Sequence, residues 1–386
     1  MRSLASAFSI PSLTLWSRSK YNHLGNPLVK LISFMSIKRD SNMKGAIFYM
    51  PNKPLKLENL PLPEITDSEI LVKVKRCNIC HTDVAIWRGE YSPRKRPPII
   101  LGHEIVGEVE EIGEKVRGFR KGDRIAISPL ISCGKCFYCK MGKDNLCDFL
   151  KTIGIDTDGG FREFINLPSE NAFKIPGQVS YEEAALLEPL SICHNAIEKA
   201  EIESENFVVL IGIGGLGMIS LQILSRLKKA NVIAVDVNDE KLEIAENFGA
   251  SYKINPNRDD LIDAVYSITN GKGADRVIEM VGNKDAQEKA IKCARKGGKV
   301  IIVGAGSHSI PVEVKRFFKE EIEVTGVYIC PKKEYKKLIK LIESKKLDLK
   351  ALITHEFKMD DINQAFKTAS GEAYDNKIPI RVSIVM

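Results

Sequence analysis

The chain has 386 residues, of which 44% are hydrophobic and 28% are charged. This mixture is typical of folded globular proteins and excludes a chain that is disordered throughout. The sequence contains no run of about 20 apolar residues, so it predicts no membrane-spanning helix. At roughly 100–200 residues per domain, the length predicts two domains.

The formal charge of +7 is concentrated at the N-terminus. Residues 1–42 hold six basic side chains and one acidic side chain, a net of +5, which leaves +2 for the rest of the chain. A body so weakly charged argues against nucleic-acid binding. The serine-rich, basic composition of residues 1–42 fits a mitochondrial transit peptide, an unstructured tail or translation from too early a start. We expect a disordered extension and a cytoplasmic protein, or a mitochondrial one if the segment is a transit peptide.

The remaining sequence changes character near Asn195. Residues 43–194 contain short strands and turns and are predicted to form a separate, β-rich domain. In residues 195–330, apolar strands such as FVVLIG and NVIAVD alternate with helical segments, which predicts a doubly wound parallel sheet. Residues 331–386 contain two helical segments and end in IPIRVSIV, a predicted strand that we expect to return to the first domain.

A glycine-rich turn follows the first strand of the alternating part. Gly212, Gly214 and Gly217 have the spacing G-x-G-x-x-G between an apolar strand and a helix. In a dinucleotide-binding turn the first glycine allows the tight turn, the second lets the backbone approach a pyrophosphate, and the third lets helix and strand pack closely. A glycine-rich turn without a nucleotide is the alternative.

An acidic residue follows the next strand, at the position where a dinucleotide-binding fold requires one. Asp236 lies 19 residues after Gly217, where a carboxylate holds the hydroxyls of the adenosine ribose. A carboxylate there repels a 2′-phosphate, and no arginine follows directly. The sequence therefore predicts NAD rather than NADP, with Lys241 as the one residue that could soften this preference.

Four of the nine cysteines lie within fifteen residues: Cys133, Cys136, Cys139 and Cys147. An odd number of cysteines with this clustering predicts metal binding in a reducing compartment rather than disulfides. Four thiolates leave no open coordination position, which suits a structural zinc ion. An iron–sulfur cluster and a zinc ribbon that binds nucleic acid are the alternatives.

A second group of metal-binding residue types precedes this loop. Cys80, His103 and Glu104 offer sulfur, nitrogen and oxygen ligands, and three protein ligands leave a fourth position open, as in a catalytic zinc site. We expect Asp83 to accept a hydrogen bond from the far nitrogen of His103. The hydroxyl of Thr82 could pass on a proton. Taken singly, each of these residues is also compatible with a purely structural position.

The motifs CNICHTD, GHEIVGEVEEIG, the four-cysteine loop, LLEPLS and GIGGLG, in this order, resemble the zinc-containing medium-chain dehydrogenase/reductase family. The resemblance extends from Met43 to the C-terminus. It implies an α/β fold in which a GroES-like, β-rich catalytic domain is split around a Rossmann domain, with the active site in the cleft. It further implies a homodimer or homotetramer with one catalytic and one structural zinc per subunit. The expected activity is hydride transfer between a small alcohol and NAD, with no nucleic acid or membrane as partner.

The segment Glu188-Pro189-Leu190 is most similar to the sorbitol and threonine dehydrogenase branch. This resemblance implies that Cys80, His103 and Glu104 bind the catalytic zinc, and that Glu188 either ligates it or holds its water. The implied catalytic residues are Thr82, Glu188 and His81. The implied cofactor contacts are Gly212, Gly214, Leu216, Gly217, Asp236, Lys241, Val303, Gly304, Ala305, Val327, Tyr328 and Ile329.

The sequence departs from this branch at three positions. Polyol dehydrogenases usually carry histidine and tyrosine where this chain has Ala85 and Ile86, and an arginine where it has Tyr328. The pocket is therefore predicted to be more apolar than a sorbitol site, which favours a secondary alcohol or a short diol. The resemblance as a whole implies a secondary alcohol, diol or polyol as substrate. Oxidation of L-threonine is the alternative within the family. A zinc lyase or hydrolase with structural NAD, and a non-catalytic redox sensor that binds NADH, are the alternatives outside it.

Overall fold

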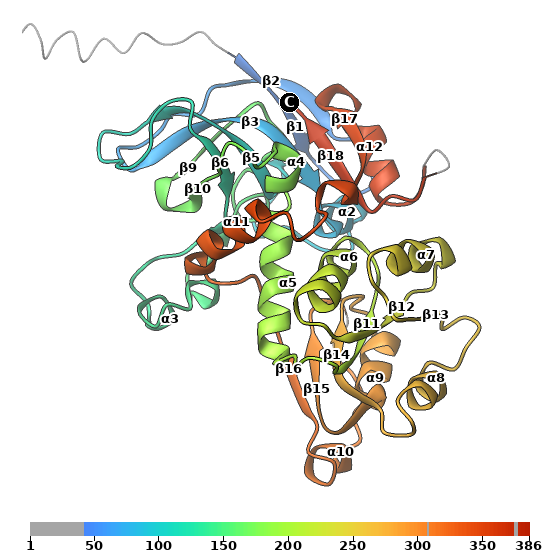
Figure 1. Ribbon diagram of the computed structural model, residues 1–386. Coiled ribbons are helices and arrows are strands. Elements are labelled where there is room, and N and C mark those ends of the chain that lie inside the picture. Colours follow the sequence, from blue (N-terminus) through green and yellow to red (C-terminus); the bar gives the residue numbers. More distant parts are fainter. Residues whose placement is uncertain (1–41, 307–308, 374–376) are drawn as a thin grey trace, which may run out of the picture. The chain divides into compact units, whose positions relative to one another are not determined.

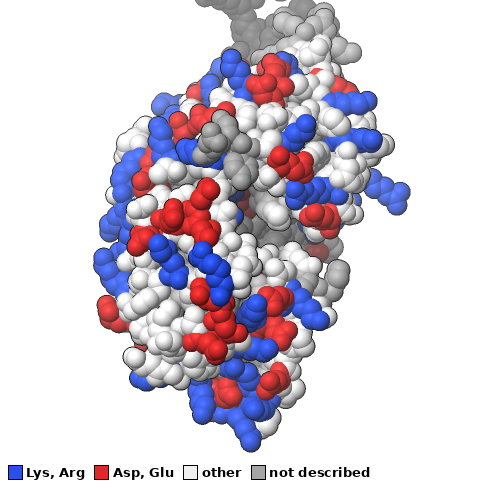
Figure 2. Space-filling model, turned by 90° about the vertical axis from the view of Figure 1, so that its right-hand side faces the viewer, with Lys and Arg blue, Asp and Glu red and all other residues white. Residues whose placement is uncertain are grey.

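The computed structural model describes residues 42–306, 309–373 and 377–386. The predicted N-terminal extension, apart from Asn42, lies outside these residues. Within them, no helix is both long enough and apolar enough to cross a membrane. Figure 2 shows basic and acidic side chains intermixed on one face of the molecule.

The N-terminal half is rich in strands (Figure 1). Its main sheet has the order β10-β6-β5-β3-β18-β17, and β9 also pairs with β3. These strands are β3 (Glu69–Ile79), β5 (Glu104–Ile112), β6 (Arg124–Ile127), β9 (Phe164–Pro168), β10 (Ala172–Lys174), β17 (Ile353–Lys358) and β18 (Arg381–Val385). Two smaller sheets join β1 (Asn42–Phe48) with β2 (Lys56–Pro61) and β4 (Ile99–Ile100), and β7 (Leu130–Ile131) with β8 (Lys151–Thr152).

The last strand of the chain lies inside this first sheet. β18 runs antiparallel to β3, with Val382 opposite Ile79, and parallel to β17. In Figure 1 the red C-terminal strands therefore lie beside blue N-terminal ones. Four of the five residues of β18 are buried, because both faces of this central strand are covered. The C-terminus thus returns to the N-terminal half, although the predicted domain boundaries at residues 194 and 330 remain predictions.

The second half contains a parallel sheet with the order β13-β12-β11-β14-β15-β16. Its strands are β11 (Phe207–Ile211), β12 (Asn231–Val235), β13 (Tyr252–Ile254), β14 (Ala274–Glu279), β15 (Ala294–Ile302) and β16 (Glu323–Gly326). The helices between them are α6 (Gly215–Gln222), α7 (Asp239–Asn247), α8 (Leu261–Ile268), α9 (Lys284–Cys293) and the short α10 (Lys315–Phe318). The order reverses between β11 and β14, and ligands of such sheets bind beyond the carboxyl ends of the strands at this point. The predicted α/β class is confirmed.

Helix α5 (Leu187–Ala200) packs between the two halves. One hydrophobic cluster contains residues of β5 and β6, most of the buried face of α5, and residues of the parallel sheet. The same cluster includes the buried face of α11 (Tyr335–Glu343). The remaining helices are α2 (His81–Arg88), α3 (Phe137–Lys140), α4 (Tyr181–Ala184) and α12 (Ile362–Ala369). Because α5 begins with Glu188 in its first turn, this packing fixes a carboxylate where the two halves meet.

Candidate active site

The strand pairing of β3 and β5 brings the predicted ligands of the first metal site together. Cys80 follows the end of β3 and is the N-cap residue of α2, while His103 and Glu104 stand at the start of β5. Asn78 of β3 lies opposite Glu104. The ligand atoms of Cys80, His103 and Glu104 all lie within 4.8 Å of one another. Residues that are distant in sequence thus form one compact donor set.

Two atoms of this donor set lack hydrogen-bond partners. His103 is 5% exposed and Glu104 is fully buried. Among the described residues, neither Nδ1 of His103 nor Oε2 of Glu104 has a partner. Buried polar atoms without partners are rare in folded proteins. A thiolate, an imidazole and a carboxylate are the ligand types of zinc, so these residues fit a zinc ion.

The predicted hydrogen bond between Asp83 and His103 is wrong for this structure. Oδ1 of Asp83 lies 3.6 Å from Nδ1 of His103, which is too long for a hydrogen bond. The carboxylate of Asp83 instead accepts backbone N–H groups of Cys80 at 2.9 Å and Gly102 at 3.1 Å. It is the third residue of α2 and caps the start of that helix. Asp83 therefore holds the backbone on both sides of the cluster.

Glu188 supplies a second buried carboxylate near the donor set. Its side chain comes from the first turn of α5 and is 3% exposed. Burial is the main cause that raises the pKa of Glu188 to about 7, and the nearby carboxylate of Glu104 acts in the same direction. The charges of His103 and Arg381 lower the pKa and oppose this rise. A divalent cation in the cluster would lower this pKa, because its charge favours the carboxylate.

Arg381 of β18 is a site residue that the sequence did not reveal. Its Nη1 donates to Oε1 of Glu104 at 2.6 Å, and both side chains are buried. Its Nε has no partner among the described residues. A Cβ atom placed on Gly215 would lie 2.4 Å from that Nε. Arg381 therefore lies between the donor set and the glycine-rich turn. The one available signal was a single arginine inside the apolar strand IPIRVSIV.

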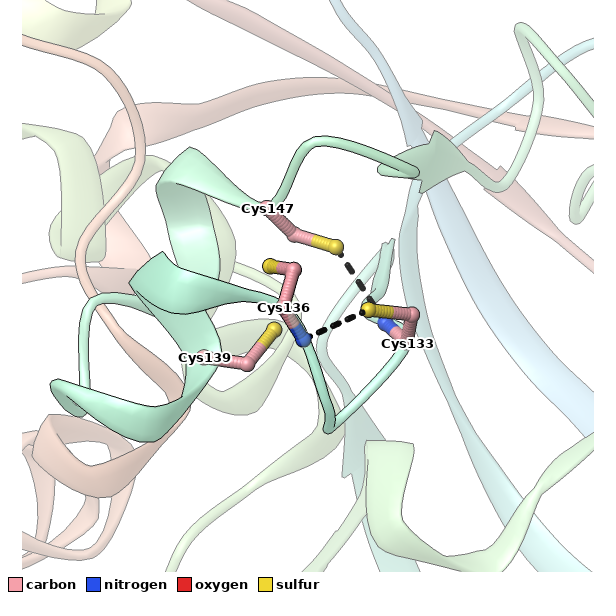
Figure 3. A group of neighbouring side chains, drawn as sticks. All are labelled: Cys133, Cys136, Cys139 and Cys147. Atoms are coloured by element: carbon pink, nitrogen blue, oxygen red, sulfur yellow. Dashed lines mark hydrogen bonds between the residues drawn. The ribbon is translucent and has the colours of Figure 1, made fainter.

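The four remaining predicted ligands also converge (Figure 3). The sulfur atoms of Cys133, Cys136, Cys139 and Cys147 lie within 4.8 Å of one another. Sγ of Cys133 accepts the backbone N–H of Cys136 at 3.4 Å, and Sγ of Cys147 accepts that of Cys133 at 3.3 Å. None of the nine cysteines forms a disulfide.

Backbone amides favour thiolates in this loop. The N–H of Lys135 is the main cause that lowers the pKa of Cys133 to about 6, whereas burial raises the pKa of Cys139 to about 12. Four adjacent sulfurs cannot all be negative without a cation nearby, because like charges at this range repel. The loop thus fits a tetrahedral zinc ion without an open position.

The glycine-rich turn has the geometry that each glycine predicts. Gly212 has a φ of 94°, a left-handed conformation that glycine adopts without strain. A Cβ on Gly217 would lie 2.1 Å from the carbonyl oxygen of Gly212, so helix and strand are in direct contact. A Cβ on Gly214 would meet nothing within 4 Å. The space at Gly214 leaves the backbone open to a ligand.

Asp236 lies directly beside this turn. Its Oδ2 accepts the backbone N–H of Ile213 at 2.8 Å, and its Oδ1 accepts that of Asn238 at 3.0 Å. The backbone N–H of Lys241 in turn donates to Oδ1 of Asn238, the N-cap residue of α7. The structure therefore brings the predicted ribose-binding carboxylate to the glycine-rich turn.

The other predicted cofactor residues follow neighbouring strands of the same sheet. Val303, Gly304 and Ala305 follow β15, and Val327, Tyr328 and Ile329 follow β16. Leu216 is on α6, and its carbonyl oxygen accepts the thiol of Cys193 from α5 at 3.3 Å. Thr82, which is partly buried, and His81, which is exposed, begin α2 next to Cys80.

Two family comparisons cover most of the chain. Residues 66–177 match the alcohol dehydrogenase GroES-like domain, and residues 215–344 match the zinc-binding dehydrogenase domain. Sorbitol dehydrogenase of Bacillus subtilis is 34% identical over 336 residues, which cover 85% of this chain and 94% of the relative. The chain belongs to the zinc-binding alcohol dehydrogenase family.

Other members of this family are similar to nearly the same extent. L-Threonine 3-dehydrogenase of Paraburkholderia phytofirmans is 32% identical over 323 residues, which cover 83% of this chain and 94% of the relative. An alcohol dehydrogenase of Escherichia coli, solved with NADH, superimposes with a TM-score of 0.83 at 28% identity, over 90% of this chain and all of that chain.

Family membership confirms several predictions made from the sequence. The chain is an oxidoreductase that uses zinc and NAD and acts on an alcohol. Its β-rich half is GroES-like and its parallel sheet is of the Rossmann type. The roles of single residues are not tested by the comparisons and remain predictions.

Proposed function

We propose that this dehydrogenase transfers a hydride from the carbinol carbon of a secondary alcohol, diol or polyol to NAD. The observation that carries this proposal is the buried donor set of Cys80, His103 and Glu104. Two of its buried polar atoms, Nδ1 of His103 and Oε2 of Glu104, have no hydrogen-bond partner among the described residues, and Arg381 connects the set to a glycine-rich turn suited to a dinucleotide. A metal ligand set and a cofactor turn in contact with one side chain fit a reaction that needs both.

The unpartnered Oε2 of Glu104 supports this residue as the third ligand beside Cys80 and His103. Zinc held there would polarise the substrate oxygen and lower the pKa of the alcohol. Glu188 then acts as a second carboxylate that orients a water molecule or the substrate hydroxyl. The four-cysteine loop holds the structural zinc and takes no part in the reaction.

We assign the removal of the substrate's hydroxyl proton to the residues at the start of α2. Thr82 lies two residues after the ligand Cys80, and its hydroxyl would accept the proton of the substrate hydroxyl. The exposed His81 next to it would pass the proton to solvent. A hydroxyl relay of this kind keeps the buried donor set shielded from water, which protects the hydride-transfer step.

NAD binding rests on the glycine-rich turn and on Asp236. The N-terminus of α6 offers backbone N–H groups and partial positive charge to the pyrophosphate, and the unpartnered Nε of Arg381 points to the same place. Asp236 holds the adenosine ribose and repels a 2′-phosphate. Lys241 and the segments after β15 and β16 supply the remaining contacts, so that the nicotinamide lies beside the substrate.

Oxidation of L-threonine is the second candidate, supported by the 32% identity with L-threonine 3-dehydrogenase. Ala85 opposes it, because that branch tends to carry a histidine there. We further infer a cytoplasmic homodimer or homotetramer. Nine unpaired cysteines suit a reducing compartment.

The test is NADH absorbance after zinc-loaded protein is mixed with NAD and a panel of secondary alcohols, diols, polyols and L-threonine. We expect NADH formation with at least one alcohol, lost when the catalytic zinc is removed and restored by added zinc. L-Threonine as the best substrate would favour the second candidate. Bound zinc and NAD without turnover of any panel member would contradict the proposal.

A further inference from the structure

The chain leaves the parallel sheet at the end of β16 and continues without regular structure over residues 327–331. β16 is the last strand in the order of its sheet, so among the described strands only β15 lies beside it. The N–H of Val327 still donates to the carbonyl oxygen of Ile302 on β15, at 3.1 Å. Three predicted cofactor contacts, Val327, Tyr328 and Ile329, lie in this segment. The groups that hold the segment therefore bear on the orientation of the nicotinamide.

Helix α5 holds the start of this segment through two side chains. Nζ of Lys199 donates to the carbonyl oxygen of Gly326 at 2.9 Å, and Nδ2 of Asn195 donates to that of Tyr328 at 2.6 Å. The donors are four residues apart, which is about 6 Å along a helix. The acceptors are two residues apart, which is about 6.6 Å along an extended chain. This match lets one side of α5 hold two alternate carbonyl groups.

The same side of α5 carries Glu188, the second carboxylate of the candidate active site. Glu188 lies seven residues before Asn195, and Asn195 lies four residues before Lys199. Side chains at these spacings share one side of a helix. α5 therefore sets the positions of Glu188 and of the segment after β16 together.

The four-cysteine loop holds the other end of the segment. Nδ2 of the buried Asn145 donates to the carbonyl oxygen of Ile329 at 2.8 Å. The carboxylate of the preceding residue, Asp144, accepts the backbone N–H of Lys332 at 3.2 Å. Both residues belong to a single 3-10 turn that ends at the predicted zinc ligand Cys147. The position of Ile329 thus depends on how the four-cysteine loop is folded.

We propose that Asn145 and Asn195 are positioning residues for hydride transfer, which fix the segment after β16 and through it the orientation of the nicotinamide ring. The inference rests on the proposed function and adds a role for the four-cysteine loop that is separate from the chemistry. A misplacement of about 1 Å can lower a reaction rate about a hundredfold. The glycine-rich turn and Asp236 are proposed to hold the rest of the dinucleotide, so loss of these bonds should affect kcat more than affinity.

The test replaces each asparagine by aspartate, which keeps the shape of the side chain but removes the N–H donor. At about pH 7.5 the new carboxylate is ionised and faces a carbonyl oxygen. With NAD and the best alcohol of the panel, kcat of the zinc-loaded full-length protein should fall about tenfold or more in Asn145→Asp and in Asn195→Asp. The Kd for NADH should change by less than about threefold, and the fluorescence emission maximum of bound NADH should shift.

Matched controls separate positioning from stability. Asn363→Asp is the control for Asn145→Asp, because Nδ2 of Asn363 on α12 also joins distant segments, donating to the carbonyl oxygen of Leu55 at 3.0 Å. It should lower the midpoint of thermal unfolding but keep the wild-type kcat and NADH emission. Asn247→Asp is the control for Asn195→Asp, because the exposed Asn247 donates to a carbonyl oxygen of its own helix, α7, at 3.3 Å. It should also keep both wild-type values.

Wild-type kcat and unshifted NADH emission in both Asn145→Asp and Asn195→Asp would overturn the inference and leave the proposed function standing. An equal fall of kcat in the control variants would overturn it too, because the bonds would then act through stability alone. If no alcohol gave NADH, the proposed function would be refuted. The emission of bound NADH would still decide whether the two asparagines position the nicotinamide, since it requires no turnover.

Discussion

Asp236 combines a structural and a selective task in one side chain. Its two oxygens accept the N–H groups of Ile213 and Asn238 and so hold the glycine-rich turn against the end of β12. We predict that its charge excludes a 2′-phosphate. Asp236→Asn keeps an oxygen and the shape but removes the charge, so we expect the ratio of kcat/KM for NAD to that for NADP to fall about tenfold or more, a loss of at least about 1.4 kcal/mol of discrimination.

Asp239→Asn is the matched control for this substitution. Asp239 lies three residues further on, and its carboxylate is already paired with Arg258 at 2.7 Å. Its replacement should leave the NAD to NADP ratio within about twofold. If both variants kept the wild-type ratio, the role of Asp236 as the selective carboxylate would be refuted.

Substitution by alanine is expected to have different effects at Gly214 and Gly217: at Gly217 on the stability of the fold, and at Gly214 on the binding of NADH. A Cβ on Gly217 would lie 2.1 Å from the Gly212 carbonyl oxygen, so Gly217→Ala must push α6 away from β11 and should lower the stability of the folded protein. Gly214→Ala meets nothing in the protein and should fold normally. We predict that the backbone approaches the pyrophosphate there, so the Kd of Gly214→Ala for NADH should rise at least about tenfold.

These two expectations are measured by thermal unfolding without cofactor and by NADH fluorescence titration. A Gly214→Ala protein that bound NADH as tightly as the wild type would contradict the assignment of the turn to the pyrophosphate.

His194 gives a prediction about pH. Burial lowers the pKa of His194 from its ordinary value of 6.5, and Lys337 adds to this, while Glu198 and Glu334 oppose it. The unfolded chain therefore takes up the proton first as the pH falls below about 6.5. The contribution of His194 to stability is complete above that pH and is lost as the pH falls toward the lower pKa of the folded state.

His194→Gln removes the titrating imidazole and with it this pH-dependent contribution to stability. The free energy of unfolding in urea, compared at about pH 7.5 and about pH 5.5, should fall less in the variant than in the wild type. A steeper loss in the variant would mean that the folded protein stabilises the charged imidazole, opposite to the effect of burial.

At the scale of elements, we predict that the four-cysteine loop binds its own zinc ion, separate from the donor set of Cys80, His103 and Glu104. Cys139→Ser removes one of four ligands, so we expect zinc content to fall from about two ions per chain to about one. Activity should also fall, since Asn145 of this loop donates to the carbonyl oxygen of Ile329 at 2.8 Å in the segment after β16. Elemental analysis and NADH absorbance measure both effects.

The control for this substitution is Cys293→Ser, which changes a buried cysteine of α9 outside both clusters. It should retain about two zinc ions. Full zinc content in Cys139→Ser would refute the assignment of the loop as a zinc site.

The elements that the sequence predicted well are those with a local signal. The strand and helix around the glycine-rich turn, and the alternation up to β15, follow from apolar runs and helical spacing within a few residues. α8 was not predicted, although Asp260 caps its start by accepting the N–H groups of Ile262 and Asp263. β13 has three residues, too few for a periodic pattern.

The site residues, too, could be predicted only where the sequence carries a local signal. The four clustered cysteines could be singled out by their spacing, and Cys80 and His103 by their residue types and the motifs around them. The pair of Arg381 and Glu104 could not be predicted, because 277 residues separate them and only the insertion of β18 beside β3 brings them into contact. The bond expected between Asp83 and His103 failed because backbone N–H groups already occupy that carboxylate.

At the scale of the whole molecule, the account requires the two halves to act on one substrate. The GroES-like half holds the donor set, the Rossmann half holds the glycine-rich turn that we propose for the cofactor, and α5 and Arg381 are in contact with both. Neither half alone has the groups for hydride transfer, because the metal ligands and the glycine-rich turn lie on different sheets. The central claim is therefore direct transfer of hydrogen from the alcohol to the nicotinamide.

The most direct test uses 1-phenylethanol or 2-propanol that carries deuterium on the carbinol carbon. The zinc-loaded protein converts it with unlabelled NAD, and mass spectrometry determines the isotope content of the NADH formed. The account predicts one deuterium per NADH, and no NADH in a Cys80→Ser protein that lacks the catalytic zinc. NADH without deuterium, or undiminished turnover in Cys80→Ser, would contradict it.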